Sequence, residues 1–182
     1  NQETMTRALA HHRAGEWQPA ENLYRAVLKR DPDCADAWHL LGLLSHQQGG
    51  HETAQKLIER AIQLNPGDAA YHVNYAEACL GLKRPGEAVE ALRRAMALEP
   101  GLAVARANLA NILYEQDRFE EALLLCQEAL ALDPASARAW DILGNLHEAL
   151  EQREAAQKAY RHAIALDPEL AKPHANLGIS LE

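Results

Sequence analysis

Histidines and cysteines are the residues of this 182-residue chain that could most readily bind a metal ion or move a proton. None of the nine histidines belongs to a His-Glu-x-x-His pattern, and no two of the three cysteines form a Cys-x-x-Cys pattern. His39 and His46 lie seven residues apart, which on one helix is about two turns, or roughly 10 Å. Zinc binds its ligands at about 2 Å, so this pair is too widely spaced to share an ion. We therefore expect no metal site and no cofactor.

Sequence motifs of catalysis are absent as well. The chain contains no Gly-x-Ser-x-Gly, no phosphate-binding glycine loop and no kinase signature. Gly49-Gly50 is typical of a turn between helices. Glu120-Glu121 is typical of a helix start, where carboxylates favour the positive end of the helix dipole. The sequence therefore predicts a protein that is not an enzyme and has no catalytic residues.

Charge and hydropathy exclude further classes of partner. The formal net charge is −8, whereas binding to a phosphate backbone needs clustered Lys and Arg, so we expect no nucleic-acid partner. No run of about 18 apolar residues could span a membrane, and residues 1–7 lack the apolar core of a signal peptide. Cys34, Cys79 and Cys126 are too few and too far apart for a disulfide framework, and we expect small buried thiols in a reducing compartment. The predicted location is cytoplasmic.

A period of 34 residues organises the chain. Five of its eight prolines mark that period: Pro32, Pro66, Pro100, Pro134 and Pro168. When the repeats are aligned on these prolines, small residues recur at the eighth, twentieth and twenty-seventh positions of each repeat. Alanine occupies the twentieth position every time: Ala20, Ala54, Ala88, Ala122 and Ala156. Small side chains let two helix backbones approach closely, so these columns predict helix–helix contacts.

Larger apolar residues complete two helix faces in each repeat. Positions four, seven, eight and eleven, and again twenty, twenty-four, twenty-seven and twenty-eight, follow the i, i+3, i+4, i+7 rule. Each repeat is therefore expected to be an antiparallel helix pair, with Asp68 and Ser136 as N-caps. The expected pairs are 1–14 with 18–30, 35–48 with 52–64, 69–82 with 86–98, 103–116 with 120–132, and 137–150 with 154–166. The expected turns lie near 15–16, 49–50, 84–86, 117–118 and 151–152.

This repeat closely resembles the tetratricopeptide repeat family. Two segments match its motif column by column: Trp38, Leu41-Gly42, Ala54, Ala61 and Pro66, and then Trp140, Leu143-Gly144, Ala156, Tyr160, Ala163 and Pro168. The resemblance implies an all-α, right-handed superhelical solenoid of antiparallel helix pairs. It also implies a protein–protein interaction module that binds peptide or protein segments in a concave groove lined by the first helix of each pair. The expected single domain spans 1–182, with repeats 1–34, 35–68, 69–102, 103–136 and 137–170 and a partial sixth repeat, 171–182.

The expected groove consists of first-helix positions that do not pack inside a repeat. We expect it to contain Leu40, Leu43, His39, Val73, Glu77, Tyr114, Arg138 and Asp141, with the asparagines Asn74, Asn108, Asn111, Asn145 and Asn176. An asparagine amide has one acceptor and two donors, so a row of solvent-facing asparagines can hold an extended peptide backbone. The row is similar to the asparagine ladder in the repeat arm of O-GlcNAc transferases.

Alternatives stay open for the role of such a module. It is a freestanding scaffold, the recruiting arm of a larger glycosyltransferase-like enzyme, or a self-assembling structural protein. The last repeat lacks its second helix, so we expect the natural chain to continue and Leu177, Ile179 and Leu181 to cause weak self-association. Family members that bind the acidic tails of cytosolic chaperones use lysine and arginine at fixed groove positions. Positions five and six here carry neither, so we expect no binding of such tails.

Overall fold

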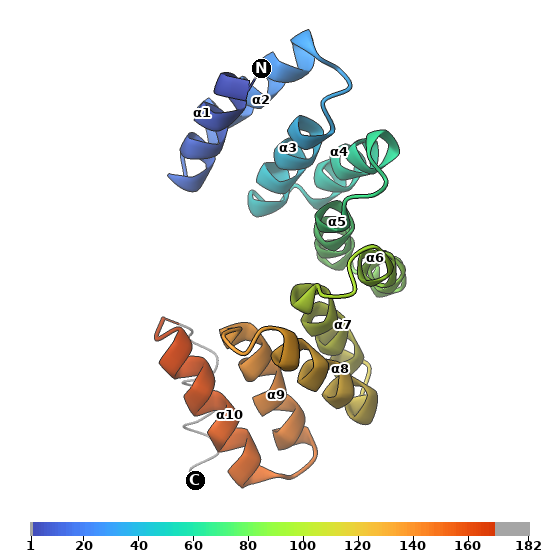
Figure 1. The fold of residues 1–182 in the computed structure, drawn as a ribbon, viewed down its shortest axis with the longest axis vertical. Helices are drawn as coiled ribbons and strands as arrows, with labels where there is room; N and C mark the ends of the chain where they lie inside the picture. Colours follow the sequence, from blue (N-terminus) through green and yellow to red (C-terminus); the bar gives the residue numbers. More distant parts are fainter. Residues whose placement is uncertain (1, 170–182) are drawn as a thin grey trace. The chain divides into compact units, whose positions relative to one another are not determined.

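The computed structural model describes residues 2–169, which form ten helices and no strand (Figure 1). The helices are α1 (Gln2–Arg13), α2 (Trp17–Arg30), α3 (Ala35–Gln47), α4 (His51–Leu64), α5 (Ala69–Gly81), α6 (Pro85–Leu98), α7 (Ala103–Glu115), α8 (Phe119–Leu132), α9 (Ala137–Ala149) and α10 (Arg153–Leu166). Each expected helix pair is confirmed to within one residue at its described ends. The expected self-association residues Leu177, Ile179 and Leu181, and the groove residue Asn176, lie outside the described residues.

The chain divides into two compact units, Asn1–Leu98 and Glu99–Glu182. In the first unit α1 pairs with α2, α3 with α4, and α5 with α6; α2 also packs against α3, and α4 against α5. In the second unit α7 pairs with α8 and α9 with α10, while α8 packs against α9. We call the first helix of each pair the A helix and the second the B helix. Successive A helices also touch within each unit, α3 with α5 and α7 with α9. The prediction of a single domain stays a prediction.

Small residues bring the two helices of each repeat together, as the repeat columns predict. The five alanines of the twentieth position are all completely buried: Ala20, Ala54, Ala88, Ala122 and Ala156. At the eighth position, a Cβ added to Gly42 would lie 2.6 Å from Cγ1 of Ile58. A Cβ added to Gly144 would lie 2.2 Å from Cε1 of Tyr160. Side-chain size at these positions therefore sets how closely the helices approach.

The turn between A and B helices has one backbone pattern in all five repeats. The fifteenth residue always has a positive φ, between 58° and 81°: Gly15, Gly49, Lys83, Asp117 and Glu151. The amide of the sixteenth residue donates to the carbonyl of the eleventh, as in Arg84 to Cys79 (2.9 Å), which closes the A helix with a Schellman-type bond. The third turn consequently lies at 82–84, and the expectation of a turn at 84–86 is wrong. Pro85 is the first residue of α6, where a missing N–H costs nothing.

Side chains at the start of α3, α5 and α9 hold the connections from the preceding B helices. Both expected N-caps are confirmed: Asp68 accepts from the amide of Ala70 (2.9 Å) and Ser136 from that of Ala139 (3.3 Å). At the fourth position, a ring N–H donates to the carbonyl of the proline that marks the period. These bonds are Trp38 to Pro32 (2.8 Å), His72 to Pro66 (3.2 Å) and Trp140 to Pro134 (2.9 Å).

The cysteines occupy the helix contacts without forming disulfides. All three are free thiols; Cys79 and Cys126 are buried and Cys34 is half-buried. Burial raises the pKa of the Cys126 thiol to about 12, and its Sγ donates to the carbonyl of Ala139 at 3.2 Å. None of the helices in residues 2–169 is both long and apolar enough to cross a bilayer.

Candidate functional site: two clefts in the first unit

A cleft of about 560 Å³ opens between the A helices of the first unit. We call it the A-helix cleft. It lies along one side of α1, the first half of α3 and the N-terminal end of α5. Its lining residues are Gln2, Met5, Thr6, Leu9, Cys34, Asp36, His39, Leu40, Asp68, Ala70 and Tyr71. Its volume falls within the range of about 300–1,000 Å³ that is usual for ligand pockets.

The apolar part of the A-helix cleft comes from two helices. Met5 and Leu9 are one turn apart on α1, and Leu40 faces them from α3. All three are half-buried, so each still presents surface to the cleft. Met5 and Leu40 also pack against the core of the first two repeats, which fixes their positions. This surface suits an aliphatic side chain of a partner.

The polar part of the cleft is acidic. Asp36 and Asp68 are its only ionised lining groups at neutral pH, since no Lys or Arg lines it. His39 also lines the cleft but is only 8% exposed, and burial lowers its pKa despite the opposing effect of Asp68 and Asp36. The imidazole is therefore neutral at pH 7. The cleft carries two negative charges.

Hydrogen bonds between neighbouring A helices hold the walls of the cleft in place. The Tyr71 hydroxyl of α5 donates to Oδ1 of Asp36 on α3, and Nδ2 of Asn74 donates to Nε2 of His39 over 2.6 Å. Burial, followed by the bond to Asp36, raises the pKa of the Tyr71 hydroxyl, so it remains a donor. Each bond joins residues 35 positions apart, that is, position n of one A helix to position n+1 of the next.

The same 35-residue relation joins α1 to α3. His12 is only 8% exposed; its Nε2 donates to Oε1 of Gln47 (2.8 Å) and its Nδ1 accepts from the Tyr24 hydroxyl (3.1 Å). Three polar pairs of this kind therefore cross-link the A helices of the first unit. This relation fixes how the A helices lie against one another within that unit.

The groove residues expected from sequence in the first unit are only partly accessible. His39 and Leu40 line the A-helix cleft, whereas Leu43, Val73, Asn74 and Glu77 lie on α3 and α5 outside its lining. His39 and Val73, which were expected in the groove, are only 8% and 5% exposed. Side chains at the fifth and sixth positions make contacts between helices, as the His39–Asn74 bond shows.

Groove residues of the second unit are also only partly accessible. Asn108, which was expected on a solvent-facing stripe, is 2% exposed, and the expected groove residue Asp141 is 7% exposed. Asn111, Tyr114 and Asn145 are half-buried, and Arg138 is exposed. Nδ2 of Asn111 donates to Glu115 (3.1 Å), and Asn145 accepts from the Tyr160 hydroxyl (3.0 Å).

Several cleft residues were not predicted from the sequence. Met5 and Leu9 belong to the terminal α1, and Asp68 precedes its helix as a cap, so a search for open positions on the central A helices passes over them. Tyr71 is at the third position, which the repeat pattern does not place in the groove. The available signal was the 35-residue spacing of complementary polar side chains, Asp36 with Tyr71 and His39 with Asn74.

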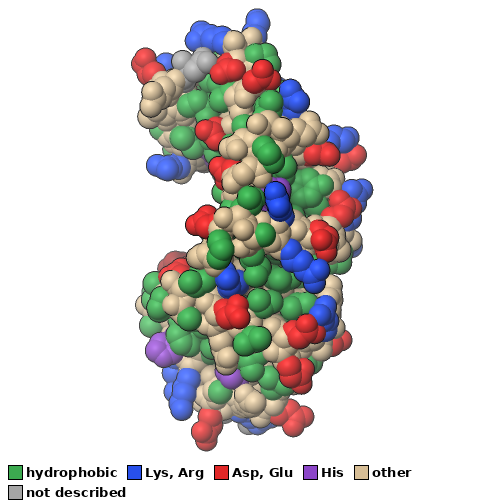
Figure 2. All heavy atoms as spheres, turned by 45° about the vertical axis from the view of Figure 1, so that its right-hand side comes forward, with side chains coloured by type: hydrophobic (Ala, Val, Ile, Leu, Met, Phe, Trp, Pro, Cys, Tyr) green, Lys and Arg blue, Asp and Glu red, His purple; other side chains and the backbone are tan. Residues whose placement is uncertain are grey.

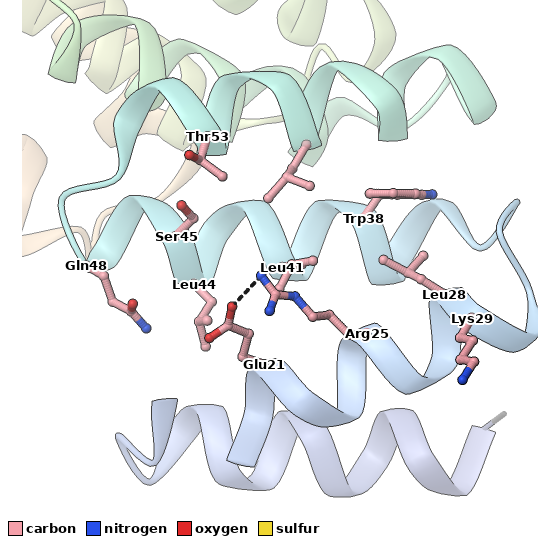
Figure 3. Close-up of a pocket in the computed structure, with 11 residues that line it drawn as sticks. Glu21, Arg25, Leu28, Lys29, Trp38, Leu41, Leu44, Ser45, Gln48 and Thr53 are labelled. Atoms are coloured by element: carbon pink, nitrogen blue, oxygen red, sulfur yellow. Dashed lines mark ion pairs between the residues drawn. The ribbon is translucent and has the colours of Figure 1, made fainter. Parts of the chain in front are cut away.

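A second cleft, of about 420 Å³, lies on the B-helix side of the first unit between α2, α3 and α4 (Figure 3). Leu41 and Leu44 come from α3, and Thr53 comes from α4. Glu21 and Arg25 of α2 form an ion pair at 2.8 Å, drawn as a dashed line in Figure 3. Its ionisable lining groups are the Glu21–Arg25 pair and Lys29, so this cleft lacks the negative charge of the A-helix cleft.

Neither cleft contains, among the described residues, a group of side chains that could hold a metal ion. Within residues 2–169, no three His, Cys, Asp or Glu side chains are gathered so that they could hold a metal ion. His46 and His51 do approach each other, with their Nδ1 atoms 3.1 Å apart across the turn between α3 and α4. A neutral pair can share one proton as a hydrogen bond.

Comparison with known proteins places the chain in a family. Residues 23–132 match the family model of the cytochrome c-type biogenesis protein H TPR domain, and residues 137–170 match a tetratricopeptide repeat model. A 69-residue stretch is 36% identical to Superkiller complex protein 3 of Mus musculus and covers 38% of this chain. The chain spans only 4% of the length of that relative.

Solved structures agree with the family models. A thermophilic TPR protein of Thermus thermophilus aligns over 99% of this chain and 98% of its own, with a TM-score of 0.82 and 17% identity. YrrB, described as a TPR protein with an unusual peptide-binding site, aligns over 94% of this chain and 89% of its own, with a TM-score of 0.68 and 22% identity. These likenesses confirm the predicted all-α helical-repeat fold. Since the first family model covers more than half of the chain, the protein belongs to the tetratricopeptide repeat family, in the group of the cytochrome c-type biogenesis protein H TPR domain.

Proposed function

We propose that this chain is a non-enzymatic interaction module that binds a segment of a partner protein in the A-helix cleft. The observation that carries the proposal is the cleft itself, which combines an apolar surface from α1 and α3 with ionised groups at the start of α3 and α5. Hydrogen bonds between the A helices keep this surface ordered before a partner binds, which lowers the conformational-entropy cost of binding. The peptide-binding site ascribed to YrrB gives a parallel on the same fold.

Selection from a displayed random-peptide library, with the full chain immobilised, tests this proposal. Leu9→Asn should weaken binding of the selected peptides by about tenfold, because burial of one aliphatic side chain contributes about 1.5–3 kcal/mol and only part of it is lost. The matched control is Leu124→Asn, which changes an exposed leucine of α8 outside the cleft. A library with no enrichment over bare support, or equal affinities for the two variants, would contradict peptide binding in this cleft.

We further propose that asparagines of the second unit form a separate site for an extended peptide backbone, in the manner of an asparagine ladder. Asn111 and Asn145 are half-buried at the ninth position of α7 and α9, two helices in contact. Side-chain hydrogen bonds orient both amides: Asn111 donates to Glu115, and Asn145 accepts from the Tyr160 hydroxyl. Among selected peptides whose affinity does not depend on Leu9, replacing both asparagines by Ala should weaken binding by about 1–3 kcal/mol, as two hydrogen bonds contribute. Unchanged affinity would rule the ladder out for these positions.

The place of the module in a larger assembly is a separate proposal. The match to a small part of a much longer relative supports a repeat segment within a longer protein, and a recruiting arm of an enzyme is one such form. Self-association is the alternative. Sedimentation velocity over a concentration series distinguishes them: a single monomeric species favours the recruiting module, and a concentration-dependent increase in sedimentation coefficient favours self-assembly.

We also propose that the protein binds no nucleic acid and works in a reducing compartment such as the cytoplasm. The net charge of −8 supports the first point, and Figure 2 shows Lys and Arg interspersed with Asp and Glu on the visible face. The second is supported by three free cysteines, two of them buried apart from each other in different repeats. Electrophoretic mobility of labelled DNA and RNA tests the first, and thiol labelling in intact cells tests the second.

A further inference from the structure

We infer that the A-helix cleft selects partner segments in which a lysine or arginine stands next to an aliphatic side chain. This inference rests on the proposed function and specifies the chemistry of the segment. It follows from the side-by-side placement of an apolar surface and two carboxylates in one cleft.

The carboxylates of Asp36 and Asp68 can each accept further hydrogen bonds from a partner. Each uses Oδ1 for an intramolecular bond, Asp36 to the Tyr71 hydroxyl and Asp68 to the amide of Ala70. A carboxylate accepts from about four directions, so each retains further acceptor positions. The ion pairs found among the described residues involve neither of them. Asp36 is exposed and Asp68 half-buried, so both can be reached from solvent.

No positive group of the cleft offsets these charges. Its lining contains no Lys or Arg, and His39 is neutral because it is buried. The arginines of α1, Arg7 and Arg13, are exposed and lie outside the lining. The positive ends of α3 and α5 reduce the negative potential but carry only about half a charge each, against two full carboxylate charges.

The apolar surface lies in the same cleft as the charges. Leu40 is one helical turn from Asp36 on α3, and Met5 and Leu9 complete the apolar surface from α1. A side chain that fills this surface places its neighbour along the chain near the start of α3. The Tyr71–Asp36 and Asn74–His39 bonds hold that arrangement.

Other segments fit this cleft less well. An acidic segment would add negative charge beside Asp36 and Asp68. A wholly apolar segment would remove water from the carboxylates without replacing its hydrogen bonds, which is unfavourable. A lysine or arginine supplies the donors and the opposite charge together. The cleft thus discriminates by charge as well as by shape.

The test uses the full chain and the random-peptide library as the probe. We expect selected peptides to be enriched in Lys or Arg adjacent to Leu, Ile, Val or Met, relative to the unselected library. One selected peptide is then synthesised with its cation intact, replaced by Gln and replaced by Glu, and its affinity is measured by fluorescence anisotropy. The affinity should fall in that order, and high salt should reduce the differences.

Matched variants assign the effect to the cleft. Asp36→Asn together with Asp68→Asn should weaken the cationic peptide about three- to tenfold, the range for two partly exposed ion pairs. Asparagine is a good N-cap in place of Asp68, and in place of Asp36 its amide oxygen can still accept from the Tyr71 hydroxyl, so the fold should be retained. The control, Glu52→Gln together with Glu90→Gln, removes the same charge from exposed positions of α4 and α6 and should leave affinity unchanged.

The possible outcomes separate this inference from the proposed function. Peptides that bind in the cleft, as shown by sensitivity to Leu9→Asn, but without enrichment of cations or loss in the Asp36/Asp68 variant, would overturn this inference and leave peptide binding standing. Enrichment of acidic peptides would also overturn it. A library with no enrichment at all would overturn the proposed function and this inference with it.

Discussion

His39 shows how a single residue can belong both to the packing of the fold and to a binding surface. It lines the A-helix cleft, yet it is almost fully buried, with its ring 4.5 Å from that of Tyr71 between centroids. Its Nε2 accepts from Asn74, which requires that nitrogen to be unprotonated. Burial and this bond favour the neutral imidazole, and Asp68 and Asp36 oppose them less strongly.

A pH dependence of stability follows from His39. Because its folded-state pKa lies below the ordinary value of 6.5, the unfolded chain takes up a proton first as the pH falls. The stabilisation is therefore present above pH 6.5 and is lost as the pH falls from there towards the folded-state pKa. We expect urea denaturation to give a lower free energy of unfolding at pH 5 than at pH 7.

A variant measures how much of the pH dependence of stability comes from His39. His39→Gln keeps a hydrogen-bond acceptor for Asn74 but cannot titrate, so its stability should fall less between pH 7 and pH 5. Some dependence should remain, because burial and the neighbouring His51 also lower the pKa of His46. A pH dependence identical to that of the unmodified chain would show that His39 does not titrate differently on folding.

The sequence predicts cleft residues poorly because their roles depend on neighbouring helices. Leu40 was expected from its position on α3 alone, and the structure places it in the cleft. Asn108 occupies the same sixth repeat position as Leu40 and was expected to be equally accessible to solvent, but it is 2% exposed. Periodicity shows which face of a helix packs inside its own repeat. It does not show how much of the remaining face the next A helix covers.

At the scale of the elements, sequence prediction succeeds because the same physical rule is repeated five times. Small residues at the eighth and twentieth positions let the A and B helices pack closely at these positions. The observed helix ends lie within one residue of the expected ones. The third turn is the exception. Pro85-Gly86 reads as a turn from composition, but the left-handed residue of that turn is Lys83, because the fifteenth position is fixed by the repeat.

Glycine at the fifteenth position should stabilise the repeats that lack it. Glu151 is exposed and has a φ of 58°, a conformation that costs an ordinary residue about 1–2 kcal/mol. Glycine removes this cost but adds about 0.4–1 kcal/mol of chain entropy to the unfolded state. Glu151→Gly should therefore raise the free energy of unfolding by about 0.5–1 kcal/mol. Thermal denaturation checks this, with Gly49→Ala at the equivalent turn expected to be destabilising; an unstable Glu151→Gly variant would contradict it.

The contact of Gly144 with Tyr160 offers a sharper test of helix packing. Tyr160 is 1% exposed, so its ring has no room to move away from an added methyl group. Overpacking costs about 1–3 kcal/mol, and the better helix propensity of alanine returns roughly 1 kcal/mol. We expect Gly144→Ala to lower the free energy of unfolding by up to about 2 kcal/mol in urea denaturation.

The third repeat suggests a second substitution that should restore part of the stability lost in Gly144→Ala. In the third repeat the same two positions hold Ala76 and Leu92, both completely buried. Adding Tyr160→Leu to Gly144→Ala recreates that pair, so the two changes together should cost less than the sum of each alone. Strict additivity in the double-mutant cycle would show that the two side chains do not compete for space.

For the whole molecule, the division into two units separates the binding surface from two of the five described helix pairs. Every lining residue of the A-helix cleft lies between residues 2 and 71, within the unit Asn1–Leu98. The stability of a repeat protein is approximately a sum of terms for each repeat and for each contact between neighbours. Three complete helix pairs with their own buried core can therefore be expected to fold without the remaining repeats.

A fragment of residues 1–98 should accordingly stay helical and bind the library-selected peptides that are sensitive to Leu9→Asn with nearly the affinity of the full chain. Residues 99–182 should not bind them, because α7–α10 contribute nothing to the lining of the cleft. Circular dichroism establishes the fold of each fragment, and fluorescence anisotropy measures peptide affinity. A helical 1–98 fragment that has lost most of the affinity would contradict a cleft confined to the first unit. A fragment that fails to fold would instead show that the terms between repeats outweigh those within them.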